Sequence, residues 1–260
     1  MYPEGFPLWG PELYVGVGEG DLSVTLHVLL MTADRKGFVW ASDQLAGTSA
    51  GYAMLEKVAY FSELGIAASI WGDSLAMFVR DAIVQEARMG RAPLGDKGAM
   101  KLFLQDVAAA VIREHKPQNL QTMPRGVILA VTGESPQLWQ LTVHHPPMAN
   151  PISSAASFGD EGNPALFFMH RYYELCDKTM PQAIAIAVHT ARMAVLMNTK
   201  GIRGIDVWTC QQKEFRQLTV AEIAPYITLS DSIDDGIRSN FILDTSIAAS
   251  IELQHDKEGT

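Results

Sequence analysis

Two apolar runs separated by a short polar turn constrain the fold of this chain more than any other feature. The runs are residues 25–32 and 38–42, and the turn between them is ADRKG at residues 33–37. Both runs are rich in β-branched and aromatic residues, which suit a pleated surface, and a short glycine-containing turn joins antiparallel neighbours. The sequence therefore predicts a β-hairpin in this part of the chain.

Three side chains of different chemistry stand at the ends of these runs. Thr25 begins the first run, Asp43 follows the second, and Lys57 lies in the next apolar segment, residues 54–61. Because the strands of a hairpin are antiparallel, Asp43 is expected opposite Thr25. A hydroxyl, a carboxylate and an ammonium are thus predicted to meet at one end of a sheet. Each residue also has a structural interpretation: a strand residue, a turn cap and a charge at a strand edge.

The hydrophobic pattern predicts four strands, two helices, three strands, two helices and a final strand, in this order. The strands are residues 24–32, 38–43, 56–62, 66–71, 126–132, 138–143, 152–157 and 205–210, and the helices are residues 73–89, 97–115, 164–176 and 180–198. The strands lack the alternation typical of a sheet with one wet face, which indicates that both faces are covered. We therefore predict an α+β fold, a four-layer αββα sandwich of two antiparallel sheets.

The composition favours one globular domain. Of the 260 residues, 48% are hydrophobic and 19% are charged, and no apolar run approaches the roughly 20 residues of a membrane span. We assign residues 25–227 to the domain, residues 1–24 to an N-terminal leader or extension, and residues 228–260 to a C-terminal extension. The N-terminal segment lacks a basic region followed by an apolar core, so we expect no secretory signal, no membrane partner and a cytoplasmic location.

Charge and the rarer residue types exclude several other functions. A net charge of −9 argues against a nucleic-acid partner, because phosphate binding depends on clustered Lys and Arg. Cys176 and Cys210 are far apart, and His144 and His145 fit a loop better than a zinc site, so neither a disulfide framework nor a metal is predicted. We expect no cofactor. His27, within an apolar strand, is expected to be a hydrogen-bonded core residue.

Five short motifs resemble, in order and spacing, those of a proteasome β-type subunit of the N-terminal nucleophile (Ntn) hydrolase superfamily. They are ASD at 41–43, KV at 57–58, GIAASIWGD at 65–73, ASFGDEG at 156–162 and GIRGIDV at 201–207. The resemblance covers roughly residues 25–210 and implies the αββα fold already predicted from the pattern of strands and helices.

The resemblance also implies roles for particular residues. Thr25 matches the nucleophile, Asp43 the carboxylate of the second strand, Lys57 the cation that tunes the site, and Gly72 a glycine whose backbone N–H can donate to an oxyanion. A hydroxyl is a poor nucleophile without an adjacent base, and an α-amino group with a pKa near ~8, freed by self-cleavage, can accept its proton. Ser23 is the alternative nucleophile.

The chain departs from the family's pattern at five positions. Val24 stands where self-cleaving members usually carry Gly, Leu45 where active members commonly carry Arg, and Asp160 where a supporting Ser is expected. Thr199 and Ile202 stand where Asp and Ser are usual. Part of the shell that supports the reactive residues in the family is therefore replaced in this chain.

Two functions from different classes follow. The first is a threonine-type peptidase or amidohydrolase that cleaves a peptide or protein substrate after an N-terminal nucleophile is exposed. The second is a non-catalytic, structural subunit that retains its N-terminal segment. Proteasome-like subunits usually work in closed rings, so we expect a homo-oligomeric ring in either case.

Overall fold

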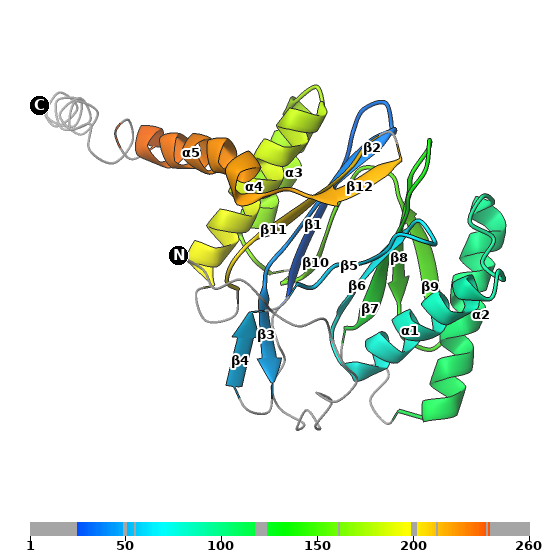
Figure 1. Ribbon diagram of the computed structural model, residues 1–260. Coiled ribbons are helices and arrows are strands. Elements are labelled where there is room, and N and C mark those ends of the chain that lie inside the picture. The colour runs from blue at the N-terminus through cyan, green and yellow to red at the C-terminus, as the bar shows by residue number, and fades with distance from the viewer. Residues whose placement is uncertain are drawn as a thin grey trace, which may run out of the picture.

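A computed structural model describes residues 25–48, 51–54, 56–117, 124–160, 162–198, 202–211, 213–237 and residue 239. Its strands form two five-stranded antiparallel sheets that face each other, with helices on the outer side of each sheet (Figure 1). The α+β, four-layer αββα sandwich predicted from the sequence is confirmed.

The first sheet carries the predicted hairpin. Its strand order is β10-β1-β2-β11-β12. The bounds are Leu26–Met31 for β1, Gly37–Ser42 for β2, Ala155–Gly159 for β10, Asp206–Gln211 for β11 and Glu214–Gln217 for β12. β1 and β2 pair from His27 opposite Ser42 to Met31 opposite Phe38, so the hairpin closes around the polar turn.

The second sheet has the order β5-β6-β7-β8-β9. Its strands are Ala59–Phe61 (β5), Ile66–Trp71 (β6), Gly126–Val131 (β7), Gln137–Thr142 (β8) and Met148–Ile152 (β9). A separate two-stranded hairpin, β3 (Leu45–Thr48) with β4 (Gly51–Met54), lies between β2 and β5 in the chain and projects from one end of the sandwich (Figure 1).

Two helices cover the second sheet and three lie on the side of the first. α1 (Ser74–Arg88) and α2 (Lys97–His115) lie over β6, β7 and β9. α3 (Ala165–Leu175) and α4 (Met180–Met197) cover the first sheet, and α5 (Val220–Ile237) packs on α4. By length and composition α4 is apolar enough to cross a membrane, but it lies against β1 and β2 and contributes buried residues to the core.

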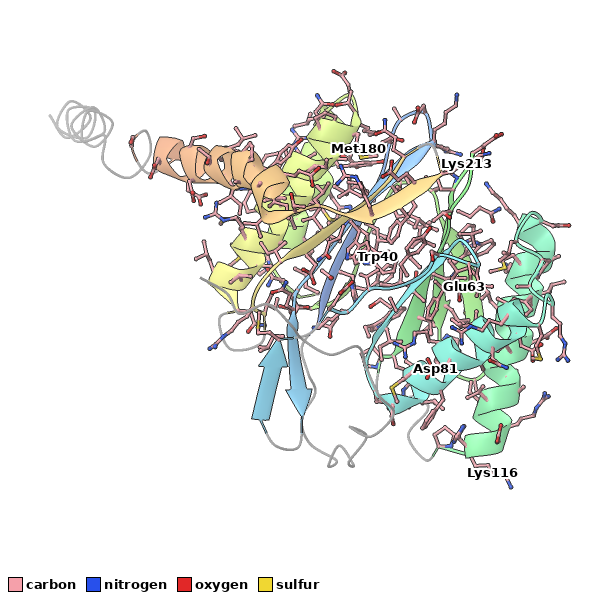
Figure 2. All side chains as sticks on the ribbon, in the orientation of Figure 1. Trp40, Glu63, Asp81, Lys116, Met180 and Lys213 are labelled. Carbon is pink, nitrogen blue, oxygen red and sulfur yellow. The ribbon has the colours of Figure 1, made fainter. Side chains whose placement is uncertain are left out.

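The core has three layers of apolar side chains. One lies between the two sheets and is rich in large rings, among them Trp40, Trp71 and Trp208. The other two join each sheet to its covering helices. Figure 2 shows Trp40 in the middle of the molecule and Lys116 and Lys213 at its edges. Because both faces of each sheet are buried, the strands are apolar without strict alternation.

The structure differs from the predicted elements in four places. The single strand predicted at residues 152–157 is two strands, β9 and β10, which belong to different sheets. β9 carries Pro151, which an edge strand tolerates because it needs no ladder donor. The β3–β4 hairpin, β12 and α5 were not predicted, and α5 runs through the boundary expected after residue 227.

Candidate active site

The hairpin places Asp43 one residue and Thr25 two residues beyond the last ladder pair of β1 and β2, which is His27 opposite Ser42. The backbone N–H of Leu26 donates to Asp43 Oδ1 at 2.7 Å, and the N–H of Asp43 donates to the carbonyl oxygen of Leu26 at 3.1 Å. Both Thr25 and Asp43 are buried. The turn and the pairing register together therefore fix the positions of the hydroxyl and the carboxylate.

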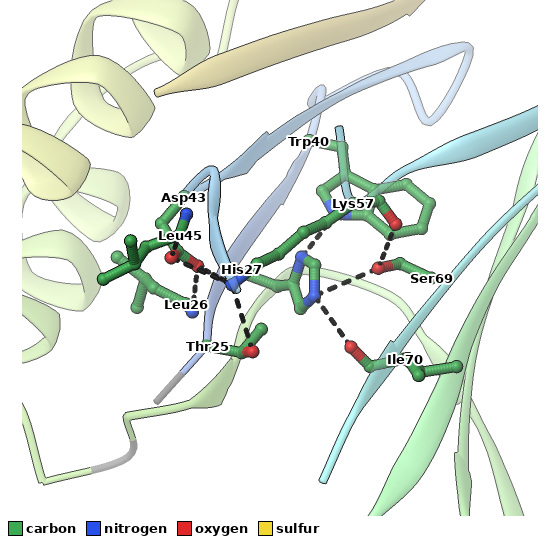
Figure 3. A network of polar contacts seen from close by, with 9 residues as sticks. All are labelled: Thr25, Leu26, His27, Trp40, Asp43, Leu45, Lys57, Ser69 and Ile70. Carbon is green, nitrogen blue, oxygen red and sulfur yellow. Dashed lines mark hydrogen bonds and ion pairs between the residues drawn. The ribbon is translucent and has the colours of Figure 1, made fainter. Parts of the chain in front are cut away.

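Lys57 joins this pair from the segment that precedes β5. Its Nζ lies 2.8 and 2.9 Å from the two oxygens of Asp43 and 3.1 Å from Thr25 Oγ1 (Figure 3). An ammonium group has three hydrogens to donate, and each of these three oxygens can accept one. The structure thus brings together the hydroxyl, carboxylate and ammonium that the sequence predicted would meet.

The Asp43 carboxylate is saturated with donors. Besides the two contacts to Lys57 and the one from Leu26, its Oδ2 accepts the backbone N–H of Leu45 at 3.1 Å. Burial raises the pKa of the Asp43 carboxyl, and Lys57 and the two backbone donors partly offset this effect. Burial likewise lowers the pKa of Lys57, and Asp43 partly offsets that change. Removing the two charged groups from water is therefore unfavourable, and their close contact together with the backbone donors offsets part of this cost.

Gly72 lies where β6 turns into α1. Its φ of +95° belongs to the region that favours glycine, and a Cβ there would lie 2.5 Å from the Cβ of Arg125. The next residue, Asp73, caps α1 and forms a 2.8 Å ion pair with Arg125. Trp71 stacks on Phe158, with ring centroids 4.9 Å apart, which holds this end of β6 against β10. The role of the Gly72 N–H as an oxyanion donor stays a prediction.

The backbone of Thr25 also contacts the last residue of β10, Gly159, and the residue after it, Asp160. The N–H of Asp160 donates to the carbonyl oxygen of Thr25 at 2.8 Å. Gly159 has a φ of +100°, and a Cβ on it would lie 1.6 Å from that same carbonyl oxygen. Only glycine fits this approach, because any side chain would push the Thr25 backbone away from its place.

The side chain of Asp160 is held by two amides. Its Oδ2 accepts from Asn163 Nδ2 at 2.9 Å and from Asn198 Nδ2 at 3.1 Å. The sequence marked Asp160 as a departure from the expected Ser, but it did not identify the two asparagines. Ile202, another departure, is buried in the core between the first sheet and its helices. Ser23, Val24 and Thr199 lie outside the described residues.

His27 is a hydrogen-bonded core residue, as the sequence predicted. It is fully buried, and its ring contacts Trp40, Ser69 and the carbonyl oxygen of Ile70. Ser69 in turn donates to the carbonyl oxygen of Lys57 at 2.7 Å. Ser69 was not among the residues predicted for the site. It is the one hydroxyl residue in the strand IAASIW, and an isolated hydroxyl in a buried strand usually has a hydrogen-bond partner.

This arrangement has the elements of a nucleophilic site without a histidine base. An ammonium 3.1 Å from a hydroxyl oxygen stabilises the alkoxide when that hydroxyl loses its proton. Across the part of the chain that the structure describes, no group of three or more His, Cys, Asp or Glu side chains could hold a metal ion.

Solved structures of known proteins share this fold. A Gly-1 mutant of Anbu from Hyphomicrobium sp. strain MC1 aligns with a TM-score of 0.63 and 14% identity, covering 84% of this chain and 96% of its own. Anbu (ancestral beta-subunit) from Yersinia bercovieri aligns with the same TM-score and 12% identity, covering 83% and 96%. No protein-family model and no curated protein matches the chain. At these identities the likeness shows the fold alone, which is a proteasome-like αββα sandwich.

Proposed function

We propose that this protein is a proteasome-like Ntn hydrolase, a threonine-type peptidase or amidohydrolase with Thr25 as its nucleophile. The observation that carries the proposal is the position of Lys57 Nζ, which contacts both Thr25 Oγ1 and the Asp43 carboxylate. A lysine whose pKa is lowered by burial and whose ammonium contacts a hydroxyl is typical of sites that activate a nucleophile. The shared fold of the Anbu structures supports the same interpretation.

In this proposal cleavage before Thr25 frees its α-amino group. That group accepts the hydroxyl proton, directly or through a water, while Thr25 Oγ1 attacks the carbonyl carbon of the scissile amide. Lys57 stabilises the negative charge that develops on Oγ1, and Asp43 keeps the ammonium in place. The N–H of Gly72 would donate to the oxyanion of the tetrahedral intermediate. The tetrahedral intermediate collapses when its C–N bond breaks, and the protonated α-amino group gives its proton to the departing amine. Water then hydrolyses the acyl-enzyme ester, which releases the carboxylic acid and regenerates the free hydroxyl.

A second function is a non-catalytic subunit that retains residues 1–24. The observation in its favour is Asp160, which stands where a supporting Ser was expected and whose carboxylate is occupied by Asn163 and Asn198. In this case the Lys57–Asp43 pair only fixes the start of β1. The two functions differ in what happens to the N-terminal segment, because a structural subunit has no need to lose it.

The intact mass of the purified protein tests the two functions. Loss of residues 1–24 would identify Thr25 as the new N-terminus, loss of residues 1–22 would identify Ser23, and the full-length mass would favour the structural subunit. Thr25→Ala should keep the full-length mass and abolish hydrolysis of a peptide reporter. Thr25→Ser serves as the matched control, because it keeps a hydroxyl at the same place and should retain part of the activity.

Assembly into a cytoplasmic homo-oligomeric ring is part of this proposal. The helices on the side of the first sheet carry large apolar side chains that this chain alone leaves exposed. They are Phe167, Phe168 and Leu175 of α3, Leu196 and Met197 of α4, and Val220 and Leu229 of α5. A second copy of the chain could cover them, and closed rings are a common way to satisfy such faces.

A further inference from the structure

A chain of hydrogen bonds runs from the interior of the sandwich to the backbone of Lys57. Trp40 Nε1 lies 3.2 Å from His27 Nδ1, and His27 Nε2 lies 3.1 Å from Ser69 Oγ. Ser69 Oγ lies 2.7 Å from the carbonyl oxygen of Lys57 (Figure 3). This series of hydrogen bonds crosses from β1 and β2 in the first sheet to β6 in the second. It ends on Lys57, the residue that contacts Thr25.

Elementary chemistry fixes the direction of every bond in this chain. The indole of Trp40 only donates and the carbonyl of Lys57 only accepts. His27 therefore accepts at Nδ1 and carries its hydrogen on Nε2, which it donates to Ser69 Oγ, with the carbonyl oxygen of Ile70 at 3.3 Å as a second acceptor. The hydroxyl of Ser69 then donates to Lys57. One tautomer of a neutral imidazole satisfies all four groups.

The surroundings of His27 keep it neutral. The side chain is fully buried, and burial together with the nearby charge of Lys57 lowers its pKa to about 3. A protonated ring would carry a hydrogen on Nδ1 that points at the indole donor of Trp40. His27 therefore stays neutral, and the directions of these hydrogen bonds stay the same, across the pH range in which an α-amino group could act as a base.

Lys57 needs such an anchor because it lies outside the ladder of the second sheet. β5 begins at Ala59, which pairs with Ala68, so Lys57 precedes the first paired residue. On its carbonyl side, the hydroxyl of Ser69 supplies a hydrogen bond from the neighbouring strand. Ser69 is fully buried and has two protein partners, which leaves it little freedom to move.

We propose that His27 and Ser69 are positioning residues, which fix the backbone of Lys57 so that its ammonium reaches Thr25 and Asp43 together. This inference rests on the proposed function, since it assigns a purpose to the place where Lys57 is held. Thr25 immediately precedes β1 and His27 is its second residue, so the two side chains are two positions apart and lie on the same side of the extended chain. The same end of β1 thus supplies the Thr25 hydroxyl and His27, which through Ser69 supports the lysine that contacts this hydroxyl.

Ser69→Ala tests the proposal, with Ser230→Ala as a matched control. Ser230 of α5 is also a buried serine bonded to a histidine, with its Oγ 2.8 Å from His189 Nδ1. It lies in the helical layer outside the first sheet and has no part in the chain of bonds that ends on Lys57. Each substitution removes one buried serine hydroxyl that is hydrogen-bonded to a histidine, so the two should cause similar losses of packing.

The first readout is the pH at which Lys57 is half modified by an amine-reactive reagent, followed by mass spectrometry of the Lys57 peptide. Burial is the largest influence that lowers the pKa of this lysine. In Ser69→Ala the loosened lysine should meet more water, so the midpoint should move up toward the ordinary lysine value. Ser230→Ala should leave it unchanged. An unchanged midpoint in Ser69→Ala would overturn the proposal.

The second readout is hydrolysis of a peptide reporter. Ser69→Ala should lose on the order of tenfold or more of the rate, because a small displacement of a reacting group is costly, and Ser230→Ala should stay near wild type. Ser69→Thr keeps the hydroxyl and should recover both the rate and the midpoint. If wild type hydrolyses nothing, the proposed function fails, but the Lys57 midpoint still decides whether Ser69 positions the lysine.

A third measurement needs no variant and decides the question if Ser69→Ala does not fold. Nitrogen chemical shifts of histidine-labelled wild-type protein report which ring nitrogen carries the hydrogen. We expect His27 to be neutral, with the hydrogen on Nε2, at and above neutral pH. A hydrogen on Nδ1 would leave the Trp40 N–H without its acceptor and would make His27 Nε2 an acceptor toward Ser69. That result would contradict the proposal.

Discussion

Replacing Lys57 by Met would separate the electrostatic part of the site from its packing. Met keeps most of the length of the lysine side chain but cannot donate to Asp43 or Thr25. The Asp43 carboxylate would then stay buried with only the N–H groups of Leu26 and Leu45 as donors. We expect Lys57→Met to lower the free energy of unfolding strongly at neutral pH, because a buried charge would be left without its counter-ion.

The size of the effect follows from burial and geometry. The side chains of Lys57 and Asp43 are 9% and 1% exposed and their N–O distance is 2.8 Å. Removing one partner of such a buried pair costs about 3–5 kcal/mol, which is about 6–20 °C in Tm for a domain of roughly 200 residues. Asp43→Asn combined with Lys57→Met removes both charges and should recover much of this loss.

Lys213→Met provides the matched control. Lys213 forms an ion pair with Glu134 at 2.9 Å, close to the distance in the buried pair, but its side chain is 61% exposed and that of Glu134 is 82% exposed. Exposed ion pairs contribute little to the free energy of unfolding, so the control should have the same Tm as wild type. A Lys57→Met variant that also melts with wild type would show that the Asp43 carboxylate is not charged and buried as the structure has it.

The pH dependence of the same variant gives the sign of the effect. Burial raises the pKa of Asp43, and loss of Lys57 removes a group that lowers it. The folded variant should therefore bind a proton at a pH where the unfolded chain does not, so its stability rises relative to wild type as the pH falls through the folded pKa. Urea unfolding at a series of pH values measures this recovery. A deficit that grows with acidification would refute the reasoning.

Three further predictions concern other parts of the molecule. Gly159→Ala should lower the free energy of unfolding by at least about 1–3 kcal/mol in thermal melts, because the new Cβ would meet the Thr25 carbonyl oxygen at a positive φ; an unchanged Tm would contradict this. Glu222→Gln should destabilise α5 at neutral pH but not near pH 2. The bonds of Glu222 to Arg216 and Thr219 lower its pKa from 4.5 to about 2, so its contribution is present above pH 4.5 and is lost as the pH falls toward 2. Sedimentation at micromolar concentration should show a homo-oligomer, and a monomer would count against the ring.

The fold was predictable where long segments repeat one strong pattern. α2 and α4 carry apolar residues at helical spacing over many turns, and the apolar strands of the central hairpin are unmistakable. The missed elements give weak signals. β12 is four residues long and buries only Phe215, and α5 contains Pro225, which is unfavourable inside a helix. Tertiary contacts, and not local propensity, form these elements.

The site was predictable at the hairpin and at Lys57, which lies in the apolar segment that follows the hairpin in the sequence. Antiparallel pairing alone places Asp43 near Thr25, because the turn fixes the register. The other partners, which come from elsewhere in the chain, gave no such signal. Asn163 and Asn198 reach Asp160 from separate places in the chain, and Ser69 reaches Lys57 from the neighbouring strand. Sequence spacing carries no information on such contacts until the sheets are stacked.

Residues 25–27 contact or support both charged residues of this site, Lys57 and Asp43. The hydroxyl of Thr25 contacts Lys57, the N–H of Leu26 donates to Asp43, and the ring of His27 supports Ser69 and through it the backbone of Lys57. A strand alternates its side chains, so a slip of one residue in β1 would turn Leu26 toward the lysine and both polar side chains toward the helices. All three connections would then be lost together. The hydrogen bonds that pair β1 with β2 and β10 therefore fix both the register of the first sheet and the geometry of the site.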